Sequence, residues 1–536
     1  MAIGLCACVA RAADGASDPK PSTAPAGARL SVSNLFSDDG VLQRSAPVPV
    51  WGKAQPGRRV TVRFGGQQQQ AVVASDGKWR VELKPMEASA EGRPLTITSD
   101  DGGEIRLANV VVGDVWLCGG QSNMQWGLVN IRAEKDIKDC NYPNLRVLTV
   151  RTELSAYPRE TIARKPPHGL WLVGNPTNAR VFSAVAYYFG REVHTQTGVP
   201  VGLIVAALTS TRIEPWIAPI GYRRVPEMKS VVDIFDRRKR EYLAQMPGYL
   251  AKMQLWVQAS QRAFAEGREF PPPPAKPRHP VYEPGDGAGG SHCLFNGMIA
   301  PLTSQPIKGA IWYQGEANGM ERITYYHKMR ALIGGWRELW GRGDFPFYYV
   351  QLANWQQPSN YAKGGDGWAA FRDVQTRCLA IANTGMAVTY DIGDAVKIHP
   401  DNKLDVGLRL ARWALAKDYG RKGAFSGPML DGMTIEGNEI RLRFQYADSG
   451  LMAGKKEGLR PVFEDKAGVL RRFAIAGKDR KWHWADARID GKTVVVSHKD
   501  VSPPVAVRYA YAWNPLGANL YNREGLPAVP FRTDDW

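Results

Sequence analysis

Cysteine is scarce in this sequence, and long apolar runs are absent from it. Only 6 of its 536 residues are cysteine, far too few for the disulfide framework of a small secreted protein. Cleavage after Ala12 would leave Cys118, Cys140, Cys293 and Cys378, which permit one disulfide bridge and require none. No stretch reaches the roughly 18–20 apolar residues that a transmembrane helix needs. The sequence therefore predicts no membrane span.

Motifs for metals and nucleotides are absent as well. No Cys or His residues have the spacing of a zinc site, and no glycine-rich phosphate loop of the required form occurs. The sequence therefore predicts no metal and no other cofactor.

Positive charge, by contrast, is plentiful. The 69 Lys and Arg residues outnumber the 52 Asp and Glu residues, which gives a net charge of +17. Such a charge attracts anionic partners. The basic residues are scattered, however, and no nucleic-acid-binding module is recognisable. We therefore expect an acidic glycan as partner, or a role of the charge in solubility, rather than nucleic acid.

The length predicts several domains, because a single hydrophobic core stops growing at about 250–300 residues. Residues 1–28 combine a short apolar run, the pattern Ala10-Arg11-Ala12 and a low-complexity stretch. Although the usual charged start is missing, this is typical of a signal-peptide remnant and linker, and it predicts export to the periplasm or the exterior. Residues 29–109 alternate short apolar segments with turn signals, which predicts an N-terminal β-sandwich.

Residues 110–423 show continuous apolar strands alternating with helical periodicity. The expected strands are 110–117, 201–207, 309–313, 347–352 and 386–391, and the expected helices include 184–196, 325–339 and 405–419. This alternation predicts an α/β domain with helices on both faces of a parallel sheet. Residues of about 222–292, a charged helix and a proline-rich stretch, are expected to form an insertion. Residues 424–536 return to short strands and predict a C-terminal β domain.

Ser122 stands where the first buried strand gives way to a helix, in the segment Gly119-Gly120-Gln121-Ser122-Asn123-Met124. The glycines permit a tight turn, and N–H groups at a helix start can stabilise an oxyanion. Met124 does not fit the nucleophile elbow Gly-x-Ser-x-Gly. Taken alone, Ser122 fits a nucleophile and a helix N-cap equally well.

Two further strand ends carry groups that suit a serine nucleophile. His399 follows the strand 386–391, and Pro400 restricts its backbone to an extended conformation. Because histidine is the usual base for a serine nucleophile, His399 is the candidate base. The segment after 309–313 contains Glu316, which is suited to orient an imidazole, and Asn318, which is suited to donate to an oxyanion. Each residue alone also fits a purely structural role. Because the carboxyl ends of parallel strands meet at one edge, we expect these groups to form one site.

These segments resemble the sialate O-acetylesterase family of SGNH hydrolases, which is related to the acetylxylan esterases of carbohydrate esterase family 6. The resemblance rests on three ordered motifs: Gly113-Asp114-Val115-Trp116-Leu117-Cys118-Gly119-Gly120-Gln121-Ser122-Asn123-Met124, Trp312-Tyr313-Gln314-Gly315-Glu316-Ala317-Asn318, and Asp391-Ile392-Gly393-Asp394 with Ile398-His399-Pro400. It covers nearly the whole chain from about Leu30. It implies an SGNH-type three-layer α/β catalytic domain flanked by two all-β domains, and a carbohydrate O-acetylesterase that works through an acetyl-enzyme.

The resemblance also implies roles for single residues. Ser122 is expected to be the nucleophile and His399 the general base and acid. SGNH enzymes commonly place Asp three residues before the histidine, where this chain has Val396. The acid is therefore expected among three other carboxylates, with Glu316 preferred, Asp391 as second choice, and Asp394.

The expected oxyanion hole combines the Ser122 N–H, the Asn318 side chain and the Ser210 N–H. The family usually has Gly-Gly-Thr before its Ile-Glu-x-Trp run, whereas this chain has Thr209-Ser210-Thr211-Arg212. A left-handed conformation at Ser210 would cost roughly 1 kcal/mol or more. Candidate substrate-binding residues are Gln121, Gln314 and Arg212, of which Arg212 would pair with a substrate carboxylate such as that of sialic acid, or lie in solvent.

Sialic acid, xylan and other acetylated glycans all stay open as substrates. An acetylxylan esterase or another glycan deacetylase would use the same chemistry. A glycan-binding protein with an impaired esterase site is the alternative from another class, because the change at Thr209-Ser210 permits it.

Overall fold

The computed structural model describes residues 29–282 and 291–536, so the expected signal-peptide remnant lies outside the described residues. The chain forms two compact units. The smaller contains the described residues up to Ser33 with residues 50–83 and 95–106, and the larger contains the rest. No helix in the described ranges is long and apolar enough to cross a membrane.

The smaller unit is built from antiparallel β-structure. Strand β4 (Arg59–Phe64) pairs with β5 (Gln67–Val72) through Gly65 and Gly66, whose φ angles of 55° and 79° suit a tight hairpin. Along β6 (Lys78–Leu83) every second residue is buried, which is the alternation of a half-buried strand. The neighbouring strands are β1 (Ser31–Val32), β3 (Val48–Lys53) and β7 (Ser89–Ser99).

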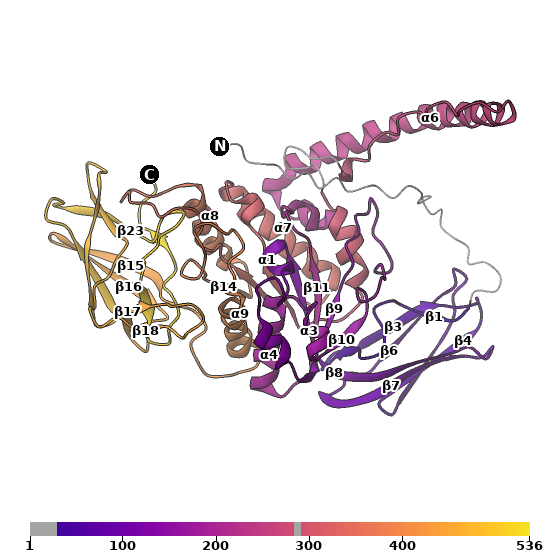
Figure 1. Ribbon diagram of the computed structural model, residues 1–536, viewed down its shortest axis with the longest axis horizontal. Coiled ribbons are helices and arrows are strands. Elements are labelled where there is room, and N and C mark those ends of the chain that lie inside the picture. Colours follow the sequence, from indigo (N-terminus) through magenta and orange to yellow (C-terminus); the bar gives the residue numbers. More distant parts are fainter. Residues whose placement is uncertain (1–28, 283–290) are drawn as a thin grey trace. The chain divides into compact units, whose positions relative to one another are not determined.

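A mostly parallel sheet forms the centre of the larger unit (Figure 1). The strand order is β10-β9-β11-β8-β12-β13-β14, and all neighbours from β9 to β14 run parallel, whereas β10 is antiparallel to β9. The strands are β8 (Glu104–Gly120), β9 (Tyr142–Thr149), β10 (Trp171–Gly174), β11 (Val201–Ala207), β12 (Gly309–Tyr313), β13 (Phe347–Val350) and β14 (Thr384–Ala387).

Each expected strand corresponds to a strand of this sheet, but β8, expected at 110–117, spans Glu104–Gly120, and β13, expected to end at 352, ends at Val350. β11 and β12 have the expected bounds, but β14 ends at Ala387, so Asp391 lies in the following loop rather than on a strand. β9 and β10 were not predicted. β9 carries Pro143 and the buried Arg146, whose guanidinium donates to the carbonyls of Pro143, Gly40 and Asn109, and these residues break the apolar pattern.

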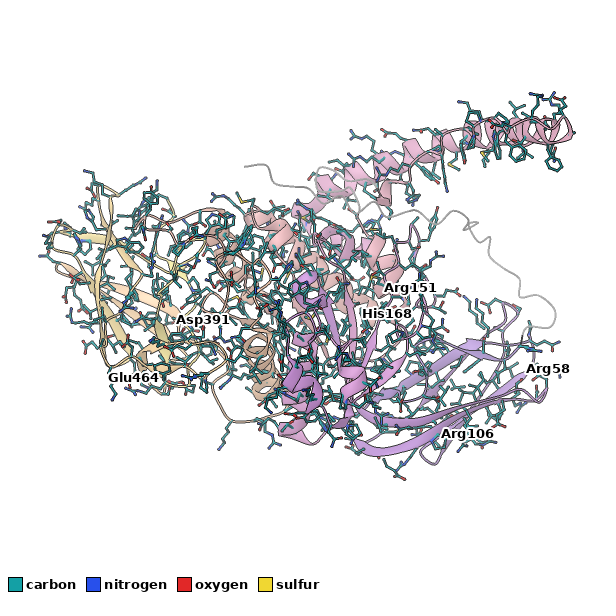
Figure 2. All side chains as sticks on the ribbon, viewed as in Figure 1. Arg58, Arg106, Arg151, His168, Asp391 and Glu464 are labelled. Carbon is teal, nitrogen blue, oxygen red and sulfur yellow. The ribbon has the colours of Figure 1, made fainter. Side chains whose placement is uncertain are left out.

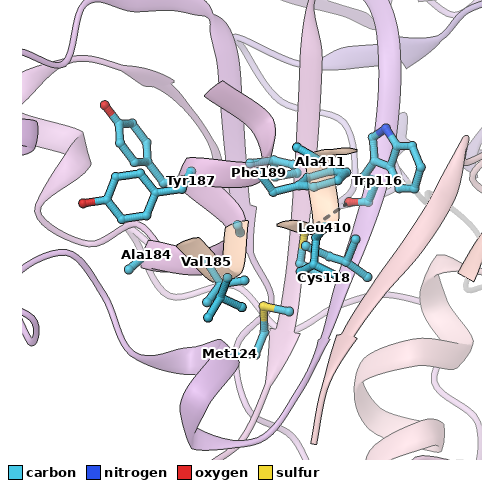
Figure 3. Close-up of a cluster of buried hydrophobic side chains, with 14 of the residues drawn as sticks. Trp116, Cys118, Met124, Ala184, Val185, Tyr187, Phe189, Leu410 and Ala411 are labelled. Atoms are coloured by element: carbon cyan, nitrogen blue, oxygen red, sulfur yellow. Dashed lines mark hydrogen bonds between the residues drawn. The ribbon is translucent and has the colours of Figure 1, made fainter. Parts of the chain in front are cut away.

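Helices pack on both faces of the sheet. On one face, α4 (Ala184–Thr197) and α9 (Lys403–Asp418) share a core with alternate residues of β8, such as Trp116 and Cys118 (Figure 3). On the other face, Trp336 of α7 (Ile323–Trp340) makes edge contacts with the rings of Trp312 and Phe347. A further helix, α8, spans Gly367–Arg377. The four cysteines in the described ranges, Cys118, Cys140, Cys293 and Cys378, are buried free thiols.

The expected insertion begins with one long helix, α6 (Lys229–Ala265), in which Ala263 is the single buried residue. The proline-rich chain that follows returns along this helix. The indole N–H of Trp256 donates to the carbonyl of Pro271, and the ring of Tyr242 packs against His279.

Short antiparallel sheets make up the C-terminal part. Arg508 and Asp534, both buried, form an ion pair that ties the last residues to β23 (Pro504–Tyr509). The remaining strands are β15 (Met429–Glu436), β16 (Glu439–Gln445), β17 (Leu451–Lys455), β18 (Phe463–Glu464), β19 (Phe473–Gly477), β20 (Trp482–Trp484), β21 (Asp486–Asp490), β22 (Thr493–Ser497), β24 (Leu520–Asn522) and β25 (Phe531–Arg532).

Candidate active site

Three neighbouring strands of the central sheet end at the same level. Gly120, the last residue of β8, pairs with Ala207 at the end of β11 and with Tyr313 at the end of β12. The loops after β8, β11 and β12 therefore begin side by side, at the edge where open α/β sheets place their functional groups.

The first loop brings Ser122 to this edge. Gly120 has a φ of 144°, and a Cβ atom there would lie 2.2 Å from the carbonyl oxygen of Tyr313, so only glycine fits. Ser122 is the first residue of α1 (Ser122–Gln125), and its N–H therefore has no acceptor within the helix. This N–H is available to a ligand.

His399 meets Ser122 from the loop after β14. Its Nε2 lies 2.8 Å from the Ser122 hydroxyl oxygen, which is the distance of a nucleophile–base hydrogen bond. The imidazole stacks on Trp126, with ring centroids 4.4 Å apart and an interplanar angle of 27°. Asn123 holds the adjoining backbone, because its Nδ2 donates to the Ile398 carbonyl at 3.1 Å.

The surroundings of His399 favour the neutral form of its imidazole. Burial, and then the charge of Lys403, lower the pKa of the His399 imidazole. A neutral imidazole is the form that can accept a proton from a serine hydroxyl. The contact geometry and the lowered pKa of His399 are both compatible with proton transfer from the Ser122 hydroxyl.

Glu316, the preferred acid, contacts Asn123 instead of the imidazole. Its Oε1 accepts from Asn123 Nδ2, and its buried Oε2 has no hydrogen-bond partner among the residues that the structure describes. Burial raises the pKa of Glu316, whereas its own backbone N–H, the Asn123 amide and Lys403 act in the opposite direction. Within residues 29–282 and 291–536, no carboxylate hydrogen-bonds to the His399 ring.

The other two carboxylates are engaged elsewhere. Asp391, labelled in Figure 2, receives two hydrogen bonds from Arg409 of α9, at 2.6 and 2.7 Å, and one from Tyr521 of β24 at 3.2 Å. Asp394 accepts from the N–H groups of Val396 and Lys397, and these bonds lower the pKa of its carboxyl. Neither carboxylate reaches His399.

Asn318 is buried in a polar network. Its Nδ2 donates to Glu214 at 3.1 Å and to Glu321 at 3.0 Å, and its Oδ1 accepts from the Ile213 N–H at 3.0 Å. Both amide hydrogens are thus used, and none is left for an oxyanion in this arrangement. Asn318 instead anchors the loop that follows β11.

The loop after β11 carries Ser210 in the left-handed region, with a φ of 58°. Two bonds fix the start of this loop against the serine segment. The Leu208 N–H donates to the Gly120 carbonyl at 3.2 Å, and the Thr209 N–H donates to Gln125 Oε1 at 2.8 Å.

The three candidate substrate-binding residues all have protein partners. Gln121 Oε1 accepts weakly from the N–H groups of Gly315 and Ala317, at 3.3 and 3.4 Å. Gln314 donates to Asn318 Oδ1 at 2.7 Å and, through its Oε1, accepts from a tyrosine hydroxyl.

Arg212 is half exposed but not unpaired. Its guanidinium donates to Glu214 at 3.1 Å and to Glu321, and the buried Lys328 pairs with the same two carboxylates. The two positive charges of Arg212 and Lys328 are therefore compensated by the two carboxylates.

Sequence patterns did not single out Asn123, Trp126 or Lys403. The first two lie within four residues of Ser122, and Lys403 lies four residues after His399. Their roles depend on contacts between distant segments, which periodicity does not report. A lysine at the start of a helix, where cations are disfavoured, was the one available signal.

Metal-ligating side chains gather away from Ser122. In the described part of the chain, one group has three potential ligand atoms within 4.8 Å of one another: His483, His498 and Asp500. His498 Nδ1 already accepts from the Asp500 N–H at 3.1 Å.

The chain is similar to carbohydrate esterases in both sequence and structure. The profile of the family described as "Carbohydrate esterase, sialic acid-specific acetylesterase" matches residues 290–416. The sialate O-acetylesterase of Rattus norvegicus is 28% identical over 94% of each chain, and that of Homo sapiens is 27% identical over 94% of this chain and 93% of its own. The crystal structure of a carbohydrate acetylesterase from Xanthomonas citri is 32% identical, with a TM-score of 0.75 over 94% of this chain and all of that one.

Proposed function

Because this chain belongs to the sialate O-acetylesterase family of carbohydrate esterases, and is thus a carboxylic ester hydrolase for O-acetylated carbohydrate, we propose that Ser122 and His399 perform its chemistry. The observation that carries this proposal is the 2.8 Å contact between Ser122 Oγ and His399 Nε2.

The proposed reaction has two steps. Ser122 Oγ attacks the acetyl carbonyl carbon while His399 Nε2 takes the hydroxyl proton, and the same proton passes to the sugar oxygen as the ester bond breaks. Water then attacks the acetyl-enzyme with His399 again as base. Acetate leaves, and Ser122 regains its proton.

For the oxyanion hole we propose the N–H groups of Ser122 and Ser210, on neighbouring loops. The helix start at Ser122 adds a favourable field for negative charge. Asn318 supports this arrangement by holding the Ile213 N–H, and it becomes a direct donor only if it releases Glu214 or Glu321.

Of the carboxylates weighed as the acid, Glu316 is the one linked to the catalytic pair. Asp391 is neutralised by Arg409, and Asp394 is bound to backbone N–H groups. We propose that Glu316 acts through Asn123, which contacts both the carboxylate and the backbone beside His399.

The family resemblance also motivates a proposal for the domain organisation. We propose an SGNH-type three-layer catalytic domain over residues 110–423, an N-terminal β-sandwich over 29–109 and a C-terminal β domain over 424–536. The packing of α4 and α9 on one sheet face and α7 on the other supports the central assignment. We also propose export, on the pattern of residues 1–28.

The substrate is proposed to be an O-acetylated sugar without a required carboxylate. Arg212, the residue considered for pairing with sialic acid, is already balanced by Glu214 and Glu321. Acetyl groups on sialic acid, on xylan and on neutral oligosaccharides are the candidates to compare.

Acetate release from a panel of acetylated sugars, with p-nitrophenyl acetate as reference, tests the proposal. The wild-type chain should release acetate from at least one sugar, and Ser122→Ala should lose this activity by roughly 10³-fold or more. Binding of the sugars without acetate release would instead support a glycan-binding protein with an impaired site.

A further inference from the structure

Lys403 is a buried cation beside the proposed nucleophile, and the chemistry described so far does not use it. The side chain is fully buried, at the first residue of the 16-residue helix α9. A positive charge is disfavoured in both settings, because burial removes its water and the helix start repels it. Such a placement calls for a compensating role.

The contacts of Lys403 differ from those of an ordinary buried lysine. In the described ranges no carboxylate lies within ion-pair distance of its ammonium group. The ammonium donates instead to Asn123 Oδ1, and it lies 5.4 Å from the ring centroid of Tyr313. By contrast, the buried Lys328 contacts two carboxylates directly.

This contact determines how the Asn123 amide is oriented. An ammonium group has only donors, so the atom that faces it must be the amide oxygen. The amide nitrogen then points the other way and donates to Glu316 Oε1 and to the Ile398 carbonyl. With the amide reversed, its nitrogen would face an ammonium and its oxygen would face a carboxylate and a carbonyl.

We propose that Lys403 is a positioning residue for the Ser122–His399 pair: by fixing the Asn123 amide, it holds the Glu316 carboxylate and the backbone that carries His399. This inference rests on the function proposed above. Lys403 touches neither reacting atom and acts through Asn123, the residue next to Ser122.

The electrostatic surroundings are consistent with this role. Burial lowers the pKa of Lys403 to about 7, whereas Glu316 and Asp401 raise it. In turn, the charge of Lys403 adds to burial in lowering the pKa of His399. Groups from three segments face the ammonium group of Lys403. Asn123 comes from α1, and Tyr313 and Glu316 come from the end of β12 and the loop after it. His399 and Asp401 come from the loop that precedes α9.

The test is a double-mutant cycle with a pH profile on p-nitrophenyl acetate. Lys403→Met should lower kcat on the order of 10²-fold, as expected for a displaced catalytic group, with little change in KM. In the Asn123→Ala background the same substitution should change kcat by less than about threefold, because residues that act as a unit are not additive. Independent, multiplying effects would overturn the proposal.

The pH profile separates positioning from a merely structural role. Without the Lys403 charge one of the two causes that lower the pKa of His399 is removed, so the acid limb of kcat/KM should move to higher pH. Lys403→Gln, which keeps a donor for Asn123 but no charge, should retain more kcat than Lys403→Met and show the same shift. An unmoved limb in both variants would contradict the account, and Lys403→Gln serves alone if the Met variant does not fold.

Lys456→Met is the matched control. The side chain of Lys456 is buried and forms an ion pair with Asp405, which lies in the first turn of α9. Lys456 does not contact Asn123. Its loss should lower stability and leave the acid limb in place. If Ser122→Ala keeps activity, the proposed function itself fails; if Ser122→Ala is inactive while Lys403→Met is unchanged, only this inference fails.

Discussion

The imidazole nitrogen Nε2 of His399 lies 2.8 Å from the hydroxyl oxygen of Ser122, although 277 residues separate the two in the chain. Ser122 follows β8 at the centre of the sheet, and His399 follows β14 at its edge. The loop of residues 388–400 spans this separation. Contacts with Trp126 and Asn123 fix its end at the serine.

The lowered pKa of His399 predicts activity at mildly acid pH. Burial and the Lys403 charge disfavour the imidazolium, so the neutral base persists to lower pH than in an ordinary histidine. The acid limb of kcat/KM should therefore lie below about 6.5, the usual pKa of histidine. Initial rates from pH 4 to 8, with thermal unfolding at each pH as control, measure this; a limb above that value would contradict the assignment.

Trp126 should matter through its ring rather than its indole N–H. Trp126→Ala removes the surface on which the His399 ring stacks, and we expect kcat to fall roughly tenfold with little change in KM, because the base is less well placed. Trp126→Phe keeps a ring and should retain most of the rate. Equal losses in the two variants would show that stacking is not the cause.

Substitution of Asp391 should mainly lower stability, whereas substitution of Glu316 should mainly lower activity. Asp391→Asn leaves the buried Arg409 without its charge partner, which should lower the free energy of unfolding by about 3–5 kcal/mol. Glu316→Gln should mainly lower kcat. Urea unfolding and steady-state kinetics on both variants decide the matter, and a stable Asp391→Asn enzyme with a selectively lowered kcat would make Asp391 the acid.

Ser210 offers a test of the loop that departs from the family pattern. Its φ of 58° suits glycine, so Ser210→Gly should keep activity and stability. Ser210→Val places a β-branched residue where it is disfavoured by about 1 kcal/mol or more, and it should lower kcat by displacing the proposed oxyanion donor. If Val and Gly variants have the same kcat, the Ser210 N–H is not part of the oxyanion hole.

The sequence predicted much of the sheet because its central strands are buried on both faces. β11 and β12 are short runs of apolar residues with clear ends, and such runs are easy to recognise. β9 was missed because it contains Arg146, a residue type that is usually exposed. Its guanidinium is buried because it donates hydrogen bonds to backbone carbonyls, and one of these, that of Gly40, is distant in the sequence.

The site was predictable only in part, for a related physical reason. Ser122 and His399 stand at strand ends, where the parallel sheet gathers functional groups. The partners of Glu316 and Asn318 are set by side-chain rotamers, and these follow from neighbours such as Asn123 and Glu214 that no local pattern connects to them. The order of strand ends therefore predicted that Ser122 and His399 lie together, but it did not predict the hydrogen-bond network around them.

Labelling with a fluorophosphonate, followed by peptide mass spectrometry, tests whether Ser122 is the nucleophile that His399 activates. Such a reagent reacts with a serine that a neighbouring base has activated. We expect a single adduct on Ser122, loss of esterase activity in step with labelling, and a strongly reduced labelling rate in His399→Ala. An active enzyme that stays unlabelled at Ser122, or is labelled at another serine, would contradict this assignment.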